Sequence, residues 1–352
     1  MTHATEASDI EIISTCPPSS GSSPDEYLDR IAEAARWSEA AGCTGILVYS
    51  DNSLVDPWLV SQLIIQRTAR IRPLVAVQPV YMHPYSVAKK ITTLAFMHRR
   101  RIDLNMVAGG FKNDLTALND TTPHDRRYQR LIEYTSIITR LLEGSAPVGC
   151  AGEFYRVEGL RLVPPLDRDL VPGIFISGSS EAGMAAASAL GATAVKYPEP
   201  AGAYRDAAPH EGLRCGIRVG IIARPNEDRA WETARTRFPE DRKGQLTRQL
   251  ATKVSDSAWH RHLTSLAEAE ADGPYWLGPF RNYKTMCPYL VGSYERVARE
   301  LAAYIRAGFR TFILDVPAGT RELGHVNETF RRALQAARAA KDLNGEPFAG
   351  AR

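Results

Sequence analysis

Short apolar runs alternate with longer amphipathic segments along most of this chain. The runs are nearly continuous in apolar residues, which is typical of strands buried on both faces of a parallel sheet. Eight of them are predicted as strands, at residues 10–15, 45–50, 73–79, 102–108, 173–178, 192–197, 215–223 and 311–315. Because a helix-like segment follows each run, the pattern predicts an α/β protein of the (β/α)8 TIM-barrel class. A doubly wound sheet is the alternative, and the absence of GxGxxG after the first run disfavours it.

Two segments interrupt the alternation. Residues 153–165 predict a β-hairpin between the fourth and fifth units. Residues 225–290 contain a helix near 227–237 and are otherwise polar, arginine-rich and turn-rich, so we interpret them as an insertion after the seventh strand. We therefore expect one barrel domain over residues 1–345, with residues 225–290 as a lid over the site.

Composition narrows the class of protein further. The net charge of +3 on 352 residues implies neither a nucleic-acid nor an anionic-membrane partner. The five cysteines form no CxxC motif and no even framework, which fits a reducing compartment. No apolar run approaches the length of a membrane span, and the first nine residues are polar. We expect a soluble cytoplasmic protein.

In a barrel, functional side chains gather at the carboxyl ends of the strands. The sequence has no paired carboxylates, no GxSxG and no HExxH motif at these positions. His260 and His262 lie close together in a polar segment but have no third ligand in view, so no metal site is expected. A site without its own acid–base pair or metal favours chemistry supplied by a cofactor.

The fourth predicted strand and its helix carry the first candidates. Asn105 is an amide in a buried strand, so it either points into the site or bonds to a neighbouring backbone group. The helix predicted over residues 125–142 carries Tyr128 and several arginines in its first turns. A helix start of this kind can hold a phosphate, although repeated arginines commonly mark a solvated face.

The stretch Ser177-Gly178-Ser179-Ser180 links the fifth strand to its helix. Such a turn offers free backbone N–H groups, hydroxyls and the positive end of a helix dipole to a phosphate. Ordinary helix capping needs the same residues, so this alternative stays open. Barrel phosphate sites more often follow strands seven and eight, which makes a fifth-strand site unusual.

Two arginines are further candidates. Arg218 lies among apolar residues of the seventh strand, where a guanidinium is costly unless paired. It either meets an internal carboxylate or faces the site to hold an anion, and we favour the second interpretation because its fork suits anionic oxygens. Arg281 and Lys284 lie in the insertion and could close over a substrate, or could be ordinary solvated charges.

These motifs together resemble the bacterial luciferase-like flavin monooxygenases, most of all the alkanesulfonate monooxygenase branch. The resemblance extends from about Tyr27 to Phe330. Its strongest pieces are residues 42–47, 56–60, 105–110, 127–128, 175–180, 216–218 and 291–293. Each piece alone is a weak signal, and their combination is specific.

The resemblance implies a barrel with FMN at the carboxyl ends of its strands. It implies a two-component monooxygenase: an NAD(P)H-dependent flavin reductase supplies reduced FMN, O2 adds at the flavin C4a carbon, and the peroxyflavin oxygenates a small polar or anionic substrate. The implied cofactor-binding residues are Asn105, Val107, Ala108, Tyr128, Gly178, Ser179 and Ser180. Arg218 matches the active-site arginine of the branch and Arg281 its mobile-loop arginine, and Tyr197 and Asn105 complete the candidate catalytic set.

The sequence departs from the sulfonate branch at three places. Leu54 replaces a cysteine, Gly220 replaces a histidine, and Pro317 replaces a tyrosine. The substrate is therefore expected to be another small polar molecule, such as an intermediate of secondary metabolism. The pocket residues that favour this are Lys196, Tyr197, Tyr283 and Asp315.

Two alternative functions share the fold. One is hydride transfer with the deazaflavin F420, which needs no oxygen, and the other is non-catalytic flavin binding. Arg218 and the polar insertion argue against the second, since a storage protein needs neither an anion clamp nor a lid. By resemblance, a homodimer or homotetramer is expected.

Overall fold

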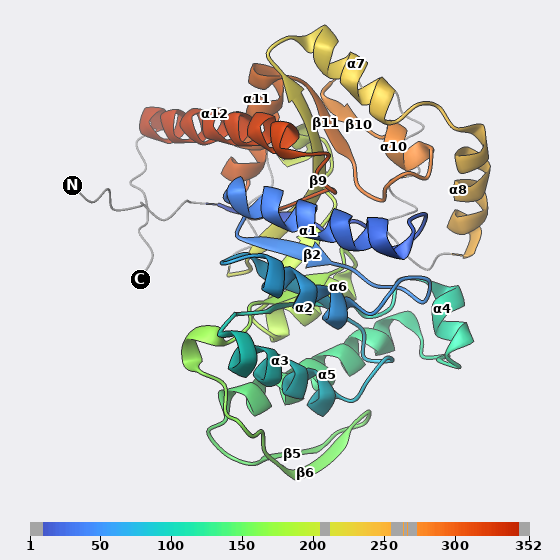
Figure 1. Cartoon of the computed structure of the whole chain (residues 1–352), viewed down its shortest axis with the longest axis vertical. Helices are drawn as coiled ribbons and strands as arrows, with labels where there is room; N and C mark the ends of the chain where they lie inside the picture. Colours follow the sequence, from blue (N-terminus) through green and yellow to red (C-terminus); the bar gives the residue numbers. More distant parts are fainter. Residues whose placement is uncertain (1–9, 205–211, 255–262, 264–265, 267–272, 345–352) are drawn as a thin grey trace.

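A computed structural model describes residues 10–204, 212–254, 263, 266 and 273–344 (Figure 1). Eight parallel strands close into a barrel, because β8 pairs with β9, β9 with β12, and β12 with β1. The predicted (β/α)8 barrel is confirmed, and the doubly wound alternative is wrong. The barrel strands are β1 (Glu11–Thr15), β2 (Gly45–Val48), β3 (Arg72–Val77), β4 (Asp103–Met106), β7 (Ile174–Ser177), β8 (Thr193–Lys196), β9 (Cys215–Arg224) and β12 (Phe309–Leu314).

Helices surround the barrel on the outside (Figure 1). They are α1 (Pro24–Ala40), α2 (Pro57–Arg67), α3 (Pro84–His98), α4 (Lys112–Ala117), α5 (His124–Glu143), α6 (Glu181–Ala189), α11 (Tyr294–Arg306) and α12 (Thr320–Asn344). Three of them begin with proline, whose fixed φ suits the first helical position. Within the described residues, no helix is long and apolar enough to span a membrane.

The interior of the barrel has an apolar layer with a polar floor beneath it. Six strands each contribute one side chain to the apolar layer, namely Ile13, Leu47, Leu74, Phe175, Val195 and Ile313. Below it, the Asp103 carboxylate accepts hydrogen bonds from Arg72 Nε at 2.9 Å and Arg101 Nε at 2.8 Å. Arg72 also pairs with Glu11 on β1. This network closes the amino-terminal end of the barrel.

Segment 225–290 builds a second, smaller sheet beside the barrel. The first half of β9 completes the barrel, and its second half pairs with β11 (Tyr289–Ser293), which in turn pairs with β10 (Tyr275–Trp276). The expected helix appears as α7 (Glu227–Arg237), and α8 (Arg242–Val254) and α10 (Gly278–Arg281) follow. Strand β11 was not predicted, because Val291-Gly-Ser reads as the start of the next helix and Ser293 is indeed its N-cap.

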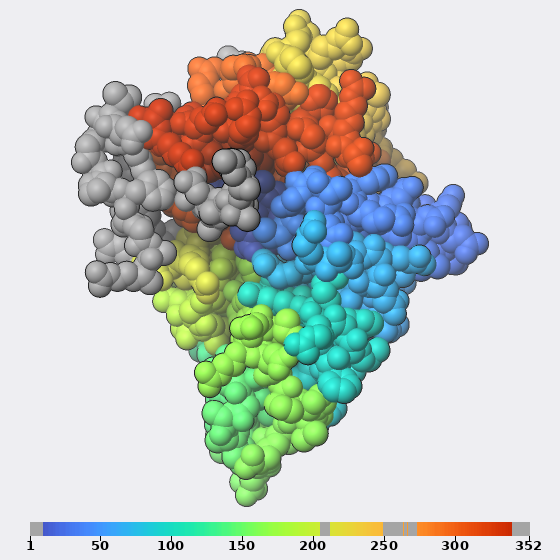
Figure 2. All heavy atoms as spheres, turned by 60° about the vertical axis from the view of Figure 1, so that its left-hand side comes forward, coloured from blue at the N-terminus to red at the C-terminus, as the bar shows by residue number. Residues whose placement is uncertain are grey.

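The predicted hairpin exists, but its strands lie earlier in the chain than expected. They are β5 (Val148–Ala151) and β6 (Arg156–Leu160), at the narrow lower end of the molecule (Figures 1 and 2). Residues 153–155 were predicted as strand, and this is wrong. Their backbone N–H groups donate to the Glu133 carboxylate of α5 instead of to a strand ladder.

Candidate active site

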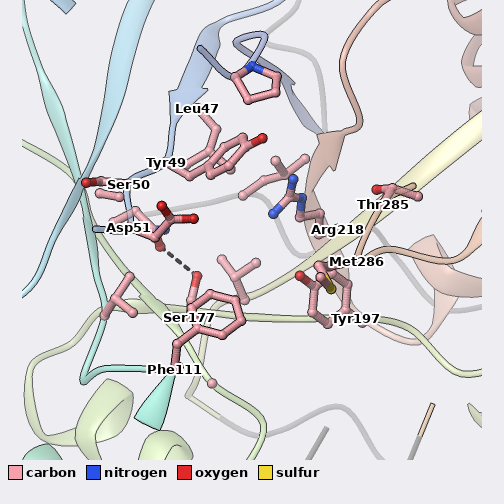
Figure 3. Close-up of a pocket in the computed structure, with 18 of the residues that line it drawn as sticks. Leu47, Tyr49, Ser50, Asp51, Phe111, Ser177, Tyr197, Arg218, Thr285 and Met286 are labelled. Atoms are coloured by element: carbon pink, nitrogen blue, oxygen red, sulfur yellow. Dashed lines mark hydrogen bonds between the residues drawn. The ribbon is translucent and has the colours of Figure 1, made fainter. Parts of the chain in front are cut away.

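A cavity of about 610 Å³ opens at the carboxyl ends of the barrel strands (Figure 3). Every barrel strand, or the loop that follows it, contributes to the lining. Nine of the ten residues predicted for the site line this cavity, namely Asn105, Val107, Ala108, Tyr128, Gly178, Ser179, Ser180, Tyr197 and Arg218. The strand-end rule therefore brings together residues that lie more than a hundred positions apart in the chain.

Asn105 is buried in the lining of this cavity. It is 5% exposed, and its side-chain oxygen accepts a 2.8 Å hydrogen bond from the Ser177 hydroxyl of the neighbouring strand. On β4 side chains alternate, so Asn105 faces the same interior as Asp103 two residues earlier. Its amide is thus bonded by a side chain of the site, and not by neighbouring backbone as in the alternative interpretation.

The amino-terminal end of α6 forms a polar corner. Ser180 is the N-cap of α6, and its hydroxyl accepts from the Gly183 N–H at 3.2 Å. Gly178 must lack a side chain, because a Cβ there would lie 2.4 Å from the Tyr128 hydroxyl oxygen. Capping and ligand binding are both possible at this corner, since Ser179 is not needed for the cap and lines the cavity.

The phenol of Tyr128 remains a hydrogen-bond donor. Burial raises its pKa, and a hydrogen bond with Ser180 opposes this rise only in part. Its helix, α5, also fixes the loop after β4, because the buried Arg127 donates to the Gly109 carbonyl at 3.0 Å. Hydroxyls, backbone N–H groups and a helix amino terminus therefore converge here, which is the donor set that a phosphate requires.

His124 also lines the cavity and was missed by the sequence analysis. It is the first residue of α5, and its ring makes an edge contact with the Tyr128 ring at 5.3 Å between centroids. The i, i+4 spacing of the two residues places them on one helix face, so this spacing was the signal that could have identified it.

Arg218 lies on β9 and lines the cavity. Its guanidinium lies beside the Tyr49 ring (Figure 3), 5.5 Å from the ring centre, and the side chain hydrogen-bonds to Tyr197. Among the described residues it forms no ion pair, and its buried Nε has no hydrogen-bond partner. Burial disfavours its charge, but acidic neighbours, Tyr197 first, outweigh this and raise its pKa. Arg218 therefore lies near the Asp315 carboxylate without forming an ion pair with it among the described residues, and it lines the cavity.

Asp315 follows β12 and lies beside Arg218. Its carboxylate accepts a 2.7 Å hydrogen bond from the hydroxyl of Tyr289, a buried residue of β11. The Tyr289 ring fills the space next to Gly220, where a Cβ would lie 2.3 Å from the ring. This explains the departure at Gly220: with Tyr289 in place, a histidine has no room there.

A model of the luciferase-like monooxygenase family matches residues 11–311. The chain belongs to the luciferase-like monooxygenases. It is 34% identical, over 82% of its length and 86% of the relative's, to the 4-(γ-L-glutamylamino)butanoyl-[BtrI acyl-carrier protein] monooxygenase BtrO of Niallia circulans. Monooxygenase relatives of this kind indicate that the protein is an oxidoreductase.

Solved structures of related proteins share the fold. The EDTA monooxygenase EmoA of Chelativorans sp. BNC1 superposes with a TM-score of 0.67 at 14% identity, over 94% of each chain. An F420-dependent secondary alcohol dehydrogenase superposes with a TM-score of 0.61 at 14% identity, over 92% of this chain and 99% of the other. At such identities the likeness shows the barrel alone.

The insertion of this luciferase-like monooxygenase supplies one side of the cavity. Arg237 and Phe238 at the end of α7, and residues 283–286 after α10, line it. Arg281, the tenth predicted site residue, is exposed on α10 and is not among the lining residues, so the structure does not bring it together with the other nine. His260 and His262, for which no metal site was expected, lie outside the described residues.

Lys196 lines the cavity, as predicted for a pocket residue. Its ammonium lies over the rings of Tyr204 and Phe309, at 5.0 and 5.3 Å, and both rings pack against Tyr304 of α11. Burial lowers the pKa of Lys196. Lys196 is thus one of the charged residues of the cavity lining, to which Arg218, Arg237, Lys284 and Asp315 also belong.

Proposed function

We propose that this luciferase-like monooxygenase uses reduced FMN and O2 to hydroxylate a small polar organic substrate, with a separate NAD(P)H-dependent flavin reductase supplying the reduced FMN. The observation that carries the proposal is the polar corner at α6, in which Tyr128, Ser179 and Ser180 line the cavity and the Tyr128 hydroxyl lies close to the Gly178 backbone. Reduced FMN supplies the two electrons that O2 needs, so that one oxygen atom enters the substrate and the other leaves as water.

The residues present fit this cofactor. The polar corner would hold the phosphate, and Asn105, Val107 and Ala108 border the cavity where the flavin ring would lie. The Asn105 amide, fixed by Ser177, can hydrogen-bond to the ring edge. A cavity of about 610 Å³ is within the usual range for cofactor sites.

The protein's own part is to bind, orient and exclude water. Arg218 offers a guanidinium in a largely buried wall, where its interaction with an anionic oxygen is stronger than in water. The insertion residues Phe238 and Met286 add apolar surface over the same cavity. We propose that segment 225–290 acts as the lid that keeps water from the reacting centre.

The relative BtrO supports a substrate class. Its named substrate is an acyl group on a carrier protein, and that acyl group ends in a γ-glutamyl unit. We propose that this chain likewise hydroxylates an acyl chain, presented as a carrier-protein thioester, in the cytoplasm. A homodimer or homotetramer remains our proposal for its assembly.

The test is an anaerobic titration of the purified protein with reduced FMN, oxidised FMN and reduced F420, followed by tryptophan fluorescence. Selective binding of reduced FMN, followed by substrate-dependent O2 uptake when a flavin reductase is added, would support the proposal. Preference for F420 would replace it with hydride transfer. Tight binding of oxidised FMN without O2 uptake would indicate a non-catalytic flavin-binding protein.

Gly178→Ala should weaken FMN binding at least tenfold. The added Cβ would lie 2.4 Å from the Tyr128 oxygen, so the phenol must move out of the phosphate corner. The matched test repeats Gly178→Ala in a Tyr128→Phe background, where the clashing oxygen is absent and the nearest ring carbon lies 3.3 Å away. The substitution should then cost less, and equal costs in both backgrounds would contradict the predicted contact.

Ser179→Ala and Ser180→Ala should separate ligand binding from helix capping. Each lost charge-assisted hydrogen bond is worth about 1.5–3 kcal/mol, so each variant should bind FMN at least about tenfold more weakly. Ser180→Ala also removes the α6 cap and should lower stability by about 1 kcal/mol, whereas Ser179→Ala should not. Isothermal calorimetry and thermal melts check both, and unchanged FMN affinity in both variants would place the phosphate elsewhere.

A further inference from the structure

The wall formed by β9, β12 and the end of α7 carries charges of both signs. Arg218 and Arg237 are cationic, Asp315 is anionic, and all three line the cavity. Asp315 contributes to the raised pKa of Arg218, so the two charges lie near each other. Yet among the described residues neither arginine forms an ion pair with Asp315. The three groups therefore remain available to charged groups of a ligand.

Asp315 is positioned by neutral donors. The Tyr289 hydroxyl donates to its Oδ2 at 2.7 Å, and the buried Cys287 thiol also hydrogen-bonds to the carboxylate. Burial, followed by the nearby Asp315 charge, raises the pKa values of both donors, so they stay protonated and do not cancel the negative charge. Asp315 is thus an oriented carboxylate at a cavity wall that forms no ion pair among the described residues.

Arg237 is positioned by the neighbouring loop. Its Nη2 donates to the Val316 carbonyl at 2.7 Å, and its guanidinium lies 5.2 Å from the Phe238 ring and 5.9 Å from the Tyr289 ring. The residue after Asp315 therefore anchors Arg237, and the ring that holds Asp315 also faces Arg237. One group of contacts fixes charges of opposite sign along the same wall.

We propose that this wall recognises a zwitterionic amino-acid end group of the substrate, with Arg218 and Arg237 binding its carboxylate and Asp315 its ammonium group. The inference rests on the proposed function and specifies its substrate class. A purely anionic ligand would place its charge against Asp315, and a purely cationic one against two arginines. A ligand with both charges satisfies all three groups, and this requirement supplies selectivity.

Three matched amides test the inference by calorimetry on the full-length protein without flavin. γ-L-glutamyl-4-aminobutanamide carries the zwitterionic end, glutaryl-4-aminobutanamide lacks its ammonium, and 4-aminobutanoyl-4-aminobutanamide lacks its carboxylate. The wild type should bind the first about tenfold to hundredfold more tightly than either analogue, as expected for one charge-assisted contact. Affinities within twofold of one another would overturn the inference, and this comparison needs no variant.

Asp315→Asn assigns the roles. It should remove the preference for the glutamyl over the glutaryl amide, while affinity for the glutaryl amide stays equal or rises. Arg218→Ala should reduce the preference for the glutamyl over the aminobutanoyl amide, with Arg237 retaining part of it. Asp29→Asn, an exposed change of the same charge on α1, should keep the wild-type ratios.

Equal losses for all three ligands in Asp315→Asn would refute the ammonium contact. Selective zwitterion binding without reduced-FMN binding would refute only the proposed function.

Discussion

Arg218→Ala is expected to lower substrate turnover at least about a hundredfold, with little change in the free energy of unfolding. The guanidinium lies in a largely buried wall, bonds to Tyr197 and forms no ion pair among the described residues. Its energetic role is therefore directed toward a ligand, and loss of one such contact to a developing or bound anion costs about a hundredfold to thousandfold. Stability should change little, because no ion pair among the described residues is broken and Asp315 keeps its hydrogen bond from Tyr289.

The measurement is kcat/KM from substrate-dependent O2 uptake with excess reductase, together with a denaturant melt. Arg218→Lys keeps the charge without the planar fork and should recover only part of the activity. Arg36→Ala, on the exposed face of α1, is the matched control and should behave as wild type. Activity of Arg218→Ala equal to that of the control would show that the guanidinium serves packing alone.

The barrel could be predicted from the sequence because its strands are buried on both faces and a helix follows each one. Strand β11 could not, because its pairing with β9 depends on a long strand that leaves the barrel halfway along. The hairpin strands lie earlier in the chain than predicted, and the reason is again a contact between residues distant in the sequence. The Glu133 carboxylate accepts hydrogen bonds from the backbone N–H groups of residues 153–155. No local sequence pattern predicts a contact between residues 20 positions apart.

The site was predicted well where side chains belong to barrel strands. Asn105 and Arg218 are polar residues within apolar strands, which made them candidates for the site. Strand alternation directs both side chains toward the cavity. Arg237 and the Asp315 partner Tyr289 were not predicted as site residues, because their positions depend on the insertion and on β11. Arg281 was chosen by resemblance within the same insertion, and the structure places it outside the lining.

The same alternation explains why β4 carries two buried polar residues. Asp103 and Asn105 both face the barrel interior, one at the closed end and one at the open end. Asp103 has three donors, the Gly173 N–H at 2.7 Å in addition to Arg72 and Arg101, so its charge is balanced by structure. Asn105 borders the cavity. One strand thus supplies a stabilising group and a candidate binding group two residues apart.

Asp103→Ala is therefore expected to lower the free energy of unfolding by about 3 kcal/mol. The carboxylate is 2% exposed and joins β3, β4 and β7, so its loss leaves buried donors without a partner. The effect should lie at the low end of the range for buried ion pairs, because the side chains of Arg72 and Arg101 are 28% and 35% exposed and keep some water contact.

Urea unfolding followed by tryptophan fluorescence measures this loss. Asp167→Ala breaks the exposed pair with Arg99 and should leave the midpoint unchanged, as surface pairs usually contribute little. A loss in Asp103→Ala no greater than in this control would show that the floor of the barrel is held by the apolar layer alone.

Below the unfolding transition, Asp103→Ala should still bind FMN with wild-type affinity. The floor and the cofactor corner lie at opposite ends of the strands, so a loss of affinity without a loss of stability would contradict their separation.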